Sequence, residues 1–264
     1  MLLTIDVGNT NTVFALFVEK TMVGSWRSVT QAQRTSDEYA VFLRSLIQVK
    51  RMDLHGIKAV IIGSVVPEAN FNLVKFCREN IPCDPLMVGT PQVETGIKIL
   101  LDHPEEIGAD RIINAVGGVL AYKPPLLIID FGTATTFDVV DADGNYVGGA
   151  IAPGINLSLQ ALHMAAAKLP RIGIAPTKQV IAKNTNDAIR SGIYWGYVGL
   201  IEGMIERIKT EFGKPMTVIA TGGLAPMFTD VVKAIDHLND HLTLHGLAEI
   251  YNRTRHRHVP HGIG

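Results

Sequence analysis

The chain carries nearly the same short phrase twice. "IDVGNT" occupies residues 5–10 and "IDFGTAT" occupies residues 129–135, about half of the 264-residue chain apart. Each copy places an Asp at the end of an apolar run, a Gly two positions later, and then Thr or Asn. Because Gly permits a tight turn without a Cβ, backbone N–H groups in such a turn can face an anion. The repeat predicts two related halves whose loops are directed at one ligand.

Hydrophobic periodicity predicts a similar series of elements in each half. An α/β fold is therefore expected, with mixed sheets flanked by helices, and with halves at residues 1–122 and 126–255. Residues 256–264 are expected to form a loose tail. In the first half we expect strands at 2–7, within 11–28, at 57–67 and at 86–89, and helices at 35–50, 70–80 and 109–122. In the second half we expect strands within 126–154 and at 216–223, and helices at 155–169, 184–212, 228–235 and 246–255.

Composition excludes several classes of protein. Hydrophobic residues make up 47% of the chain and charged residues 19%, which is typical of a globular protein with a sizeable core. The formal net charge is −1, and basic residues cluster only in the C-terminal "RTRHRH", so neither nucleic-acid binding nor a membrane surface is expected. The N-terminal stretch has no signal-peptide pattern, so a cytoplasmic location is expected. Cys77 and Cys83 match no metal-ligand spacing and are expected to be reduced thiols, with a disulfide as the less favoured alternative.

The two loops have both a structural and a functional interpretation. A single Asp-x-Gly after a strand is usually only a turn. Two copies in matching settings, with a third glycine turn in "ATGG" at 220–223, favour a ligand site instead. The array is neither a Walker loop nor a dinucleotide-binding fingerprint. Two such loops facing each other across a cleft would grip a polyphosphate, with the Asp carboxylates near its metal ions.

These residues resemble a known superfamily. The two Asp loops and the late Thr-Gly-Gly are similar to those of the acetate kinase, sugar kinase, Hsp70 and actin superfamily, whose two halves have a ribonuclease H-like fold. "GADR" at 108–111, "GGAIAPG" at 148–154, "AAAKLP" at 165–170 and "NT…AIRSG" at 184–192 narrow the resemblance to type III pantothenate kinases. The resemblance runs in order from about residue 2 to residue 250. It implies ATP-dependent phosphorylation of pantothenate at the first step of coenzyme A synthesis, by a cytoplasmic homodimer.

The resemblance also implies a role for each site residue. Asp110 would be the catalytic base, and Asp130 would bind a monovalent cation, K⁺ or NH₄⁺. Asp6 would lie by the Mg²⁺ of the nucleotide, and Thr133 would be a second ATP contact. The implied first ATP loop is Asp6, Val7, Gly8, Asn9, Thr10, Asn11, Thr12 and Val13, and the implied pantothenate contacts are Gly108, Ala109, Asp110, Arg111 and Thr185.

One position departs from the family pattern. Many relatives have Tyr where this chain has Leu101, just before "DHP", and this leaves one pantothenate contact in question. Arg111 suits either the pantothenate carboxylate or the positioning of Asp110, and the sequence leaves both open. From spacing alone, "ADR" is also typical of a solvated ion pair at a helix start.

Other residues have a preferred structural interpretation. His163 is expected to pack on a helix face, and Asp138 and Asp141 are expected at a strand end and a turn. Glycines at spacings of four, three and four predict a close helix contact, with a dimer interface as one place for it. These glycines are Gly192, Gly196, Gly199 and Gly203, and the histidines expected in the tail are His256, His258 and His261.

Two other functions are weighed against the kinase on the sequence alone. A non-catalytic nucleotide-binding regulator of the same family would keep the loops and lose the base, but Asp110 is present. An actin-like polymer would call for extra subdomains that this chain is too short to hold.

Overall fold

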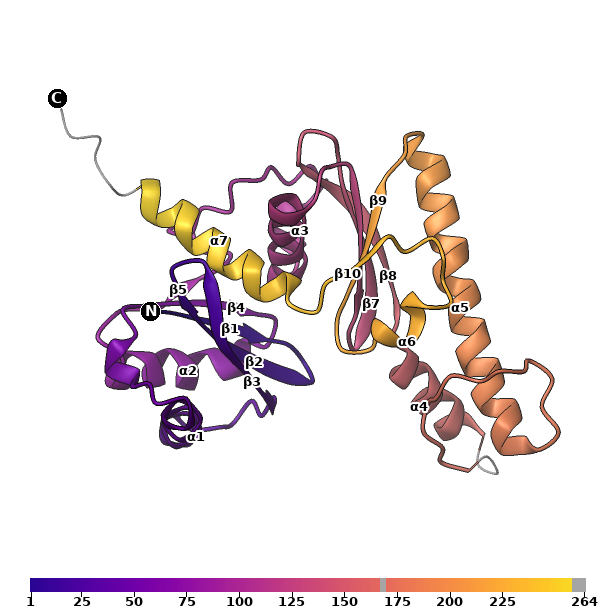
Figure 1. The fold of residues 1–264 in the computed structure, drawn as a ribbon, viewed down its shortest axis with the longest axis horizontal. Helices are drawn as coiled ribbons and strands as arrows, with labels where there is room; N and C mark the ends of the chain where they lie inside the picture. Colours follow the sequence, from indigo (N-terminus) through magenta and orange to yellow (C-terminus); the bar gives the residue numbers. More distant parts are fainter. Residues whose placement is uncertain (167–169, 258–264) are drawn as a thin grey trace. The chain divides into compact units, whose positions relative to one another are not determined.

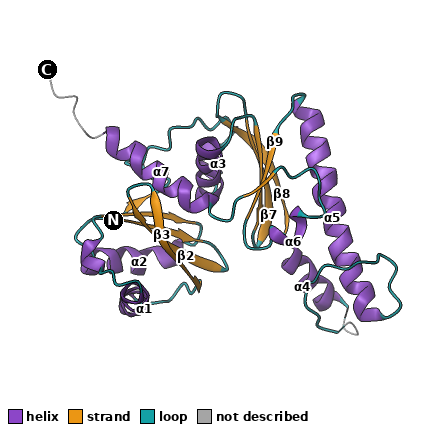
Figure 2. Ribbon diagram, in the orientation of Figure 1, coloured by secondary structure: helices purple, strands orange, loops and turns teal. Residues whose placement is uncertain are grey.

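Residues 1–166 and 170–257 are described by the computed structural model, and they form two five-stranded sheets (Figures 1 and 2). The first sheet has the order β3-β2-β1-β4-β5 and the second has the order β10-β9-β6-β7-β8. The first contains β1 (Leu2–Val7), β2 (Asn11–Val18), β3 (Thr21–Val29), β4 (Ala59–Ser64) and β5 (Leu86–Met87). The second contains β6 (Leu126–Phe131), β7 (Ala134–Val140), β8 (Tyr146–Pro153), β9 (Thr217–Thr221) and β10 (His237–Leu238).

The strands of the second sheet, in the order β8-β7-β6-β9-β10, have the same topology as those of the first. In each sheet, the first three strands in chain order pair antiparallel with one another. The fourth strand in chain order pairs parallel with both the first and the fifth. The expected α/β fold with two mixed sheets flanked by helices is confirmed.

Helices cover both faces of the first sheet. Alternate β1 side chains Leu3, Ile5 and Val7 pack with α1 (Ser36–Val49) and α2 (Pro67–Asn80). Residues facing the other way, including Leu2 and Ile61, pack with α3 (Ala109–Ala121) and α7 (Leu242–Arg257). α1 begins as the sequence predicts, because Thr35 and Glu38 form a reciprocal capping box.

The second sheet has its own core. Leu127, Ile129 and Phe131 of β6 pack with Tyr197 and Ile201 of α5 (Thr185–Phe212). The same cluster includes Ile155 at the start of α4 (Ile155–Ala165) and Phe228 of α6 (Pro226–Thr229). Segment 98–102 belongs to this unit, because the backbone of Tyr146 pairs with Lys98 and Leu100.

Two compact units result, and their boundaries differ from the expected halves. The first unit comprises residues 1–97, 103–120 and the chain from Leu242 onward, and the second comprises 98–102 and 121–241. The C-terminal helix α7 therefore lies in the first unit, where Leu247 and Ile250 are fully buried. Sequence periodicity identifies a helix here but does not reveal which sheet it covers.

Three local expectations need comment. The helix expected at 228–235 is only α6, because the following segment turns through Val232 and joins the second sheet, where Asp236 bonds Val218. Residues 256 and 257, expected in the tail, continue α7, whereas residues 258–264 and 167–169 lie outside the described part. Cys77 and Cys83 are free thiols, as expected. None of the helices in the described ranges has the length and hydropathy of a membrane span.

Candidate functional site

The first Asp loop lies at the end of β1. Asp6 pairs with Val13 of β2 and with Gly63 of β4, so it stands where two parallel strands end. The Gly8 N–H donates to the Asn11 carbonyl at 3.0 Å and closes a three-residue turn. Asn9 and Thr10 at the tip are exposed. In sheets of this kind, ligands bind outside the carboxyl ends of the strands, which is where this turn lies.

Thr30, which follows β3, bonds this loop at three points. Its hydroxyl donates to the Gly8 carbonyl at 2.6 Å, and its N–H donates to the Thr10 carbonyl at 2.9 Å. The hydroxyls of Thr12 and Thr30 lie 2.9 Å apart. Thr12 is only 1% exposed, so its hydroxyl lies at the base of the loop. Sequence reasoning missed Thr30, although the hairpin register that pairs Asn11 with Val29 places it beside the loop.

The GADR segment forms the first turn of α3. Asp110 is half-buried, and one of its carboxylate oxygens accepts the Arg111 N–H at 2.8 Å. Burial raises the pKa of the Asp110 carboxyl above its usual value, while the Arg111 N–H and guanidinium act against this effect. A Cβ at Gly108 would lie 2.6 Å from the Asp110 Oδ1, so the carboxylate lies against the bare glycine.

Contacts within the first unit bring the GADR segment near the first loop. Val65, in the turn after β4, donates its N–H to the Val7 carbonyl at 3.0 Å. A side-chain carbon of Val65 lies 3.8 Å from where a Gly108 Cβ would be. Val65 thus contacts both the end of β1 and the start of α3. The structure therefore places Asp6 and Asp110 at the same end of the first sheet.

The second Asp loop is one residue shorter. The Gly132 N–H donates to the Ala134 carbonyl at 3.0 Å, which leaves only Gly132 and Thr133 between β6 and β7. The Gly154 N–H donates to the Thr133 carbonyl at 3.1 Å, immediately before α4. A Cβ at Gly154 would clash with the carbonyls of both loop residues.

Tyr197 of α5 holds the base of this loop. Its hydroxyl bonds the hydroxyl of the buried Thr135, and it also donates to the Pro153 carbonyl at 3.2 Å. Burial raises the pKa of the Tyr197 hydroxyl. No local pattern marks this residue in the sequence, because a Tyr in the middle of a long helix is typical of any core.

The late glycine turn packs directly on Asp130. Asp130 pairs with Thr221 of β9, and Gly222 follows with a left-handed φ of 91°. A Cβ at Gly222 would lie 2.5 Å from the Asp130 Oδ1 and 2.7 Å from the Phe131 carbonyl oxygen. The Asp130 carboxylate and the Phe131 backbone therefore lie so close to residue 222 that only glycine fits there.

The remaining candidate residues lie elsewhere in the second unit. Thr185 is exposed at the first position of α5, where Asn184 caps the helix, and the first turns of α5 extend beside α4 (Figure 1). Leu101 lies beside Gly148 of β8. The buried Asp138 carboxylate accepts the Tyr146 hydroxyl at 2.7 Å.

Five further residues had structural expectations. Asp141 accepts N–H bonds from Asp143 and Asn145, as a turn residue does. His163 of α4 is half-buried and accepts a bond from Arg171 at 3.1 Å. His256 lies in α7, and His258 and His261 lie outside the described residues.

Comparison with known proteins identifies relatives along nearly the full chain. The family model for type III pantothenate kinase matches residues 2–207. A type III pantothenate kinase of Paramagnetospirillum magneticum is 58% identical over 253 residues, covering 96% of this chain and 97% of the relative. One from Rhodospirillum rubrum is 55% identical over 255 residues, covering 97% and 99%.

Solved structures share the fold at low identity. A conserved putative Baf family transcriptional activator from Campylobacter jejuni aligns with a TM-score of 0.60 at 15% identity, covering 96% of this chain and 99% of that one. A putative 2-dehydro-3-deoxygalactonokinase from Sinorhizobium meliloti aligns with a TM-score of 0.57 at 10% identity, covering 100% and 99%. At such identities the likeness concerns the fold alone. The family follows from the sequence relatives and the matching family model: this chain belongs to the type III pantothenate kinases.

Proposed function

We propose that this protein transfers the γ-phosphoryl group of ATP to the primary hydroxyl of pantothenate, giving 4'-phosphopantothenate for coenzyme A synthesis. Family membership at 58% identity supports the reaction. The observation in the structure that carries it is the half-buried Asp110, which lies at the same end of the first sheet as the Asp6 loop. A non-catalytic regulator would have no need of a carboxylate in that position.

Asp110 is the proposed general base. A carboxylate within hydrogen-bond reach of the alcohol orients it and accepts its proton during attack on phosphorus. Burial raises the pKa of Asp110, so the group takes up a proton more readily than an ordinary Asp. The phosphoryl transition state is loose, so positioning and charge neutralisation matter more than a strong base.

The pantothenate contacts are proposed to be Gly108 to Arg111 and Thr185. Gly108 leaves room for the Asp110 carboxylate to lie back against the helix start. Arg111 acts on that carboxylate through its N–H and its charge, and its planar guanidinium is proposed to contact the substrate carboxylate as well.

The nucleotide is proposed to contact residues 6–13 and Thr133. A kinase of this family uses ATP and a divalent metal ion, and the donor set fits such an ion. No cluster of three His, Cys, Asp or Glu occurs in the described part of the chain, whereas Asp6 supplies one carboxylate beside an exposed turn. Mg²⁺ is usually held by one or two carboxylates together with substrate phosphates and water. When bound, the ion would neutralise charge on the phosphates.

Asp130 is proposed to bind the monovalent cation. The Asp130 carboxylate and the Phe131 carbonyl oxygen lie close together where the Gly222 turn packs on them. Oxygen ligands of this kind suit a hard cation. K⁺ or NH₄⁺ bound to Asp130 would add positive charge beside the second loop.

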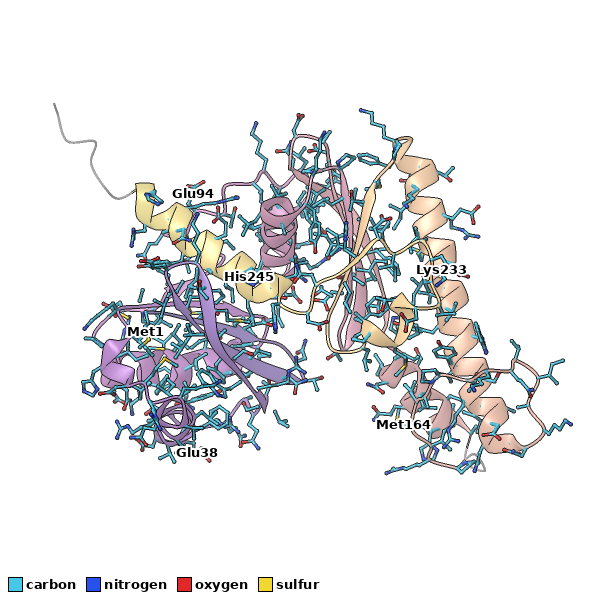
Figure 3. The ribbon with its side chains drawn as sticks, viewed as in Figure 1. Met1, Glu38, Glu94, Met164, Lys233 and His245 are labelled. Atoms are coloured by element: carbon cyan, nitrogen blue, oxygen red, sulfur yellow. The ribbon has the colours of Figure 1, made fainter. Side chains whose placement is uncertain are left out.

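A cytoplasmic homodimer is the proposed assembly. Gly192, Gly196 and Gly199 are exposed on α5, and a Cβ at any of them would meet no atom within 4 Å. Among the described residues, the predicted close helix contact is therefore not made at those three glycines. Exposed apolar side chains lie in the same unit and are typical of an interaction surface, among them Met164 (Figure 3), Leu157, Leu162, Val180 and Ile181.

A coupled assay tests the function. Purified protein with ATP, Mg²⁺ and K⁺ is offered pantothenate and a panel of other small alcohols, and ADP release is followed. Of the alcohols offered, we expect only pantothenate to support ADP release. Mass spectrometry of the phosphorylated product confirms the transfer. ADP release that does not depend on pantothenate, or none with any alcohol, would contradict the proposal.

A further inference from the structure

We propose that Thr30 is a positioning residue for ATP, which sets the shape of the Gly8–Thr10 loop through its hydroxyl. The inference rests on the proposed function, because it assumes that this loop receives the nucleotide phosphates. Thr30 lies outside the phrase that carries the Asp motif, beyond the end of β3.

The direction of the hydrogen bonds follows from the donors available. The Thr30 hydroxyl has one proton, and it donates that proton to the Gly8 carbonyl at 2.6 Å. The contact of 2.9 Å with Thr12 must then use the Thr12 proton, so the Thr12 hydroxyl donates to Thr30. The buried Thr12 hydroxyl thus supports Thr30, which in turn holds the loop.

Thr30 fixes two carbonyls of a three-residue turn. Its side chain binds the Gly8 carbonyl and its backbone N–H binds the Thr10 carbonyl. With both carbonyl oxygens directed toward Thr30, neither projects toward an anion at the exposed tip. A carbonyl turned outward would repel a phosphate, since both carry negative charge on oxygen.

A mutation can remove the hydrogen bond from the Thr30 hydroxyl to the Gly8 carbonyl. Thr30→Val keeps the shape of the side chain but loses the hydroxyl, so the Gly8 carbonyl loses its partner. The backbone bond to Thr10 remains in that variant. Thr30→Ser restores the hydroxyl without the methyl group, and Thr21→Val makes the same change at the exposed opposite end of β3.

Steady-state kinetics with each substrate varied separately tests the inference. We expect Thr30→Val to raise KM for ATP by about five- to tenfold, the cost of one lost hydrogen bond. KM for pantothenate should stay unchanged, Thr30→Ser should remain within about twofold of the unmutated protein, and Thr21→Val should match it. Calorimetric titration with a non-hydrolysable ATP analogue and Mg²⁺ should show the same ratio without turnover.

Three outcomes would overturn the inference. A lower melting temperature of Thr30→Val with an unchanged KM for ATP would mean that Thr30 only stabilises the fold. Equal defects in Thr30→Val and Thr30→Ser would mean that the hydroxyl alone does not restore ATP binding, so the effect would not belong to the bond with Gly8. If Thr30→Val does not fold, Thr30→Ala is compared with Thr30→Ser, and equal ATP affinity in the two has the same meaning. Absence of pantothenate turnover in the unmutated protein would instead count against the proposed function.

Discussion

The two Asp loops occupy equivalent places in two sheets of the same topology, but they are held in different ways. In the first unit, Thr30 reaches the loop with a side-chain hydroxyl as well as its backbone N–H. In the second, Gly154 occupies the matching position after the third strand and donates only its N–H. A side chain at Gly154 would clash with the loop carbonyls. The residue after the third strand therefore supports the first loop with a replaceable hydroxyl, and the second loop with backbone packing alone.

The difference suits the roles proposed for the two loops. The three-residue Asp6 loop has an exposed tip, where the nucleotide phosphates are proposed to bind. In the two-residue loop, Gly154 packs on the loop carbonyls and Gly222 packs on Asp130, the proposed ligand of the monovalent cation. Thr133, at the exposed tip of that loop, is the proposed second ATP contact. Two loops with the same opening residues are thus proposed to make different contacts.

Loss of Asp110, the proposed base in the first unit, should have the largest effect. Asp110→Asn should lower kcat by about 10²–10⁴-fold, while an ATP analogue still binds. The raised pKa means that Asp110 favours folding below its unfolded value of 3.8, and that this contribution is lost as pH rises through the folded value. At neutral pH the Asn variant should thus be no less stable than the unmutated protein.

The matched control for that variant is Asp143→Asn, at an exposed turn in the second unit. Turnover and urea unfolding are measured for both. An Asp110→Asn protein with full turnover would remove Asp110 as the base.

Alanine substituted at each of the two supporting residues should change the stability of the two units by different amounts. Gly154→Ala should lower the free energy of unfolding by about 1–3 kcal/mol, because backbone atoms must move. Thr30→Ala should cost about 1 kcal/mol, the value of one hydrogen bond. Urea midpoints measure both, and Gly173→Ala, where a Cβ meets no atom within 4 Å, is the control. A larger loss at Thr30 than at Gly154 would reverse the comparison.

The dependence of the rate on K⁺ should require Asp130 of the second loop. Replacing K⁺ by Na⁺ should slow the unmutated protein by about tenfold, on the scale of one lost charge-stabilising contact. Asp130→Asn should be slow in both salts, with little difference between them. Initial rates at constant ionic strength measure this. Equal rates in the two salts with the unmutated protein would contradict the role given to Asp130.

The smallest expected effect is a shift in pH dependence. Asp110 acts in its ionised form, so kcat/KM should fall as pH falls through its pKa, and burial places that pKa above 3.8. A pH–rate profile, with circular dichroism to confirm folding at each pH, measures the acidic limb. Activity that stays level down to pH values near 3.8, with the protein folded, would contradict the raised pKa.

The sequence predicted much of this arrangement because its signals are local. Both Asp loops and the helix starts near Thr35 and Asn184 depend on residues a few positions apart. The contacts of Thr30 with Gly8, of Gly222 with Asp130, and of α7 with the first sheet join residues far apart in the chain. Hydrophobic periodicity predicts which face of a helix or strand is buried. It does not predict which distant element packs against that face.

The position of α7 has a consequence for how the protein is made. α7, which covers the second face of the first sheet together with α3, is the last element of the described residues to leave the ribosome. Leu2 of β1 and Ile61 of β4 must therefore stay without this cover until α7 has been made. A chain shortened before Leu242 would lose not a tail but one wall of its N-terminal core.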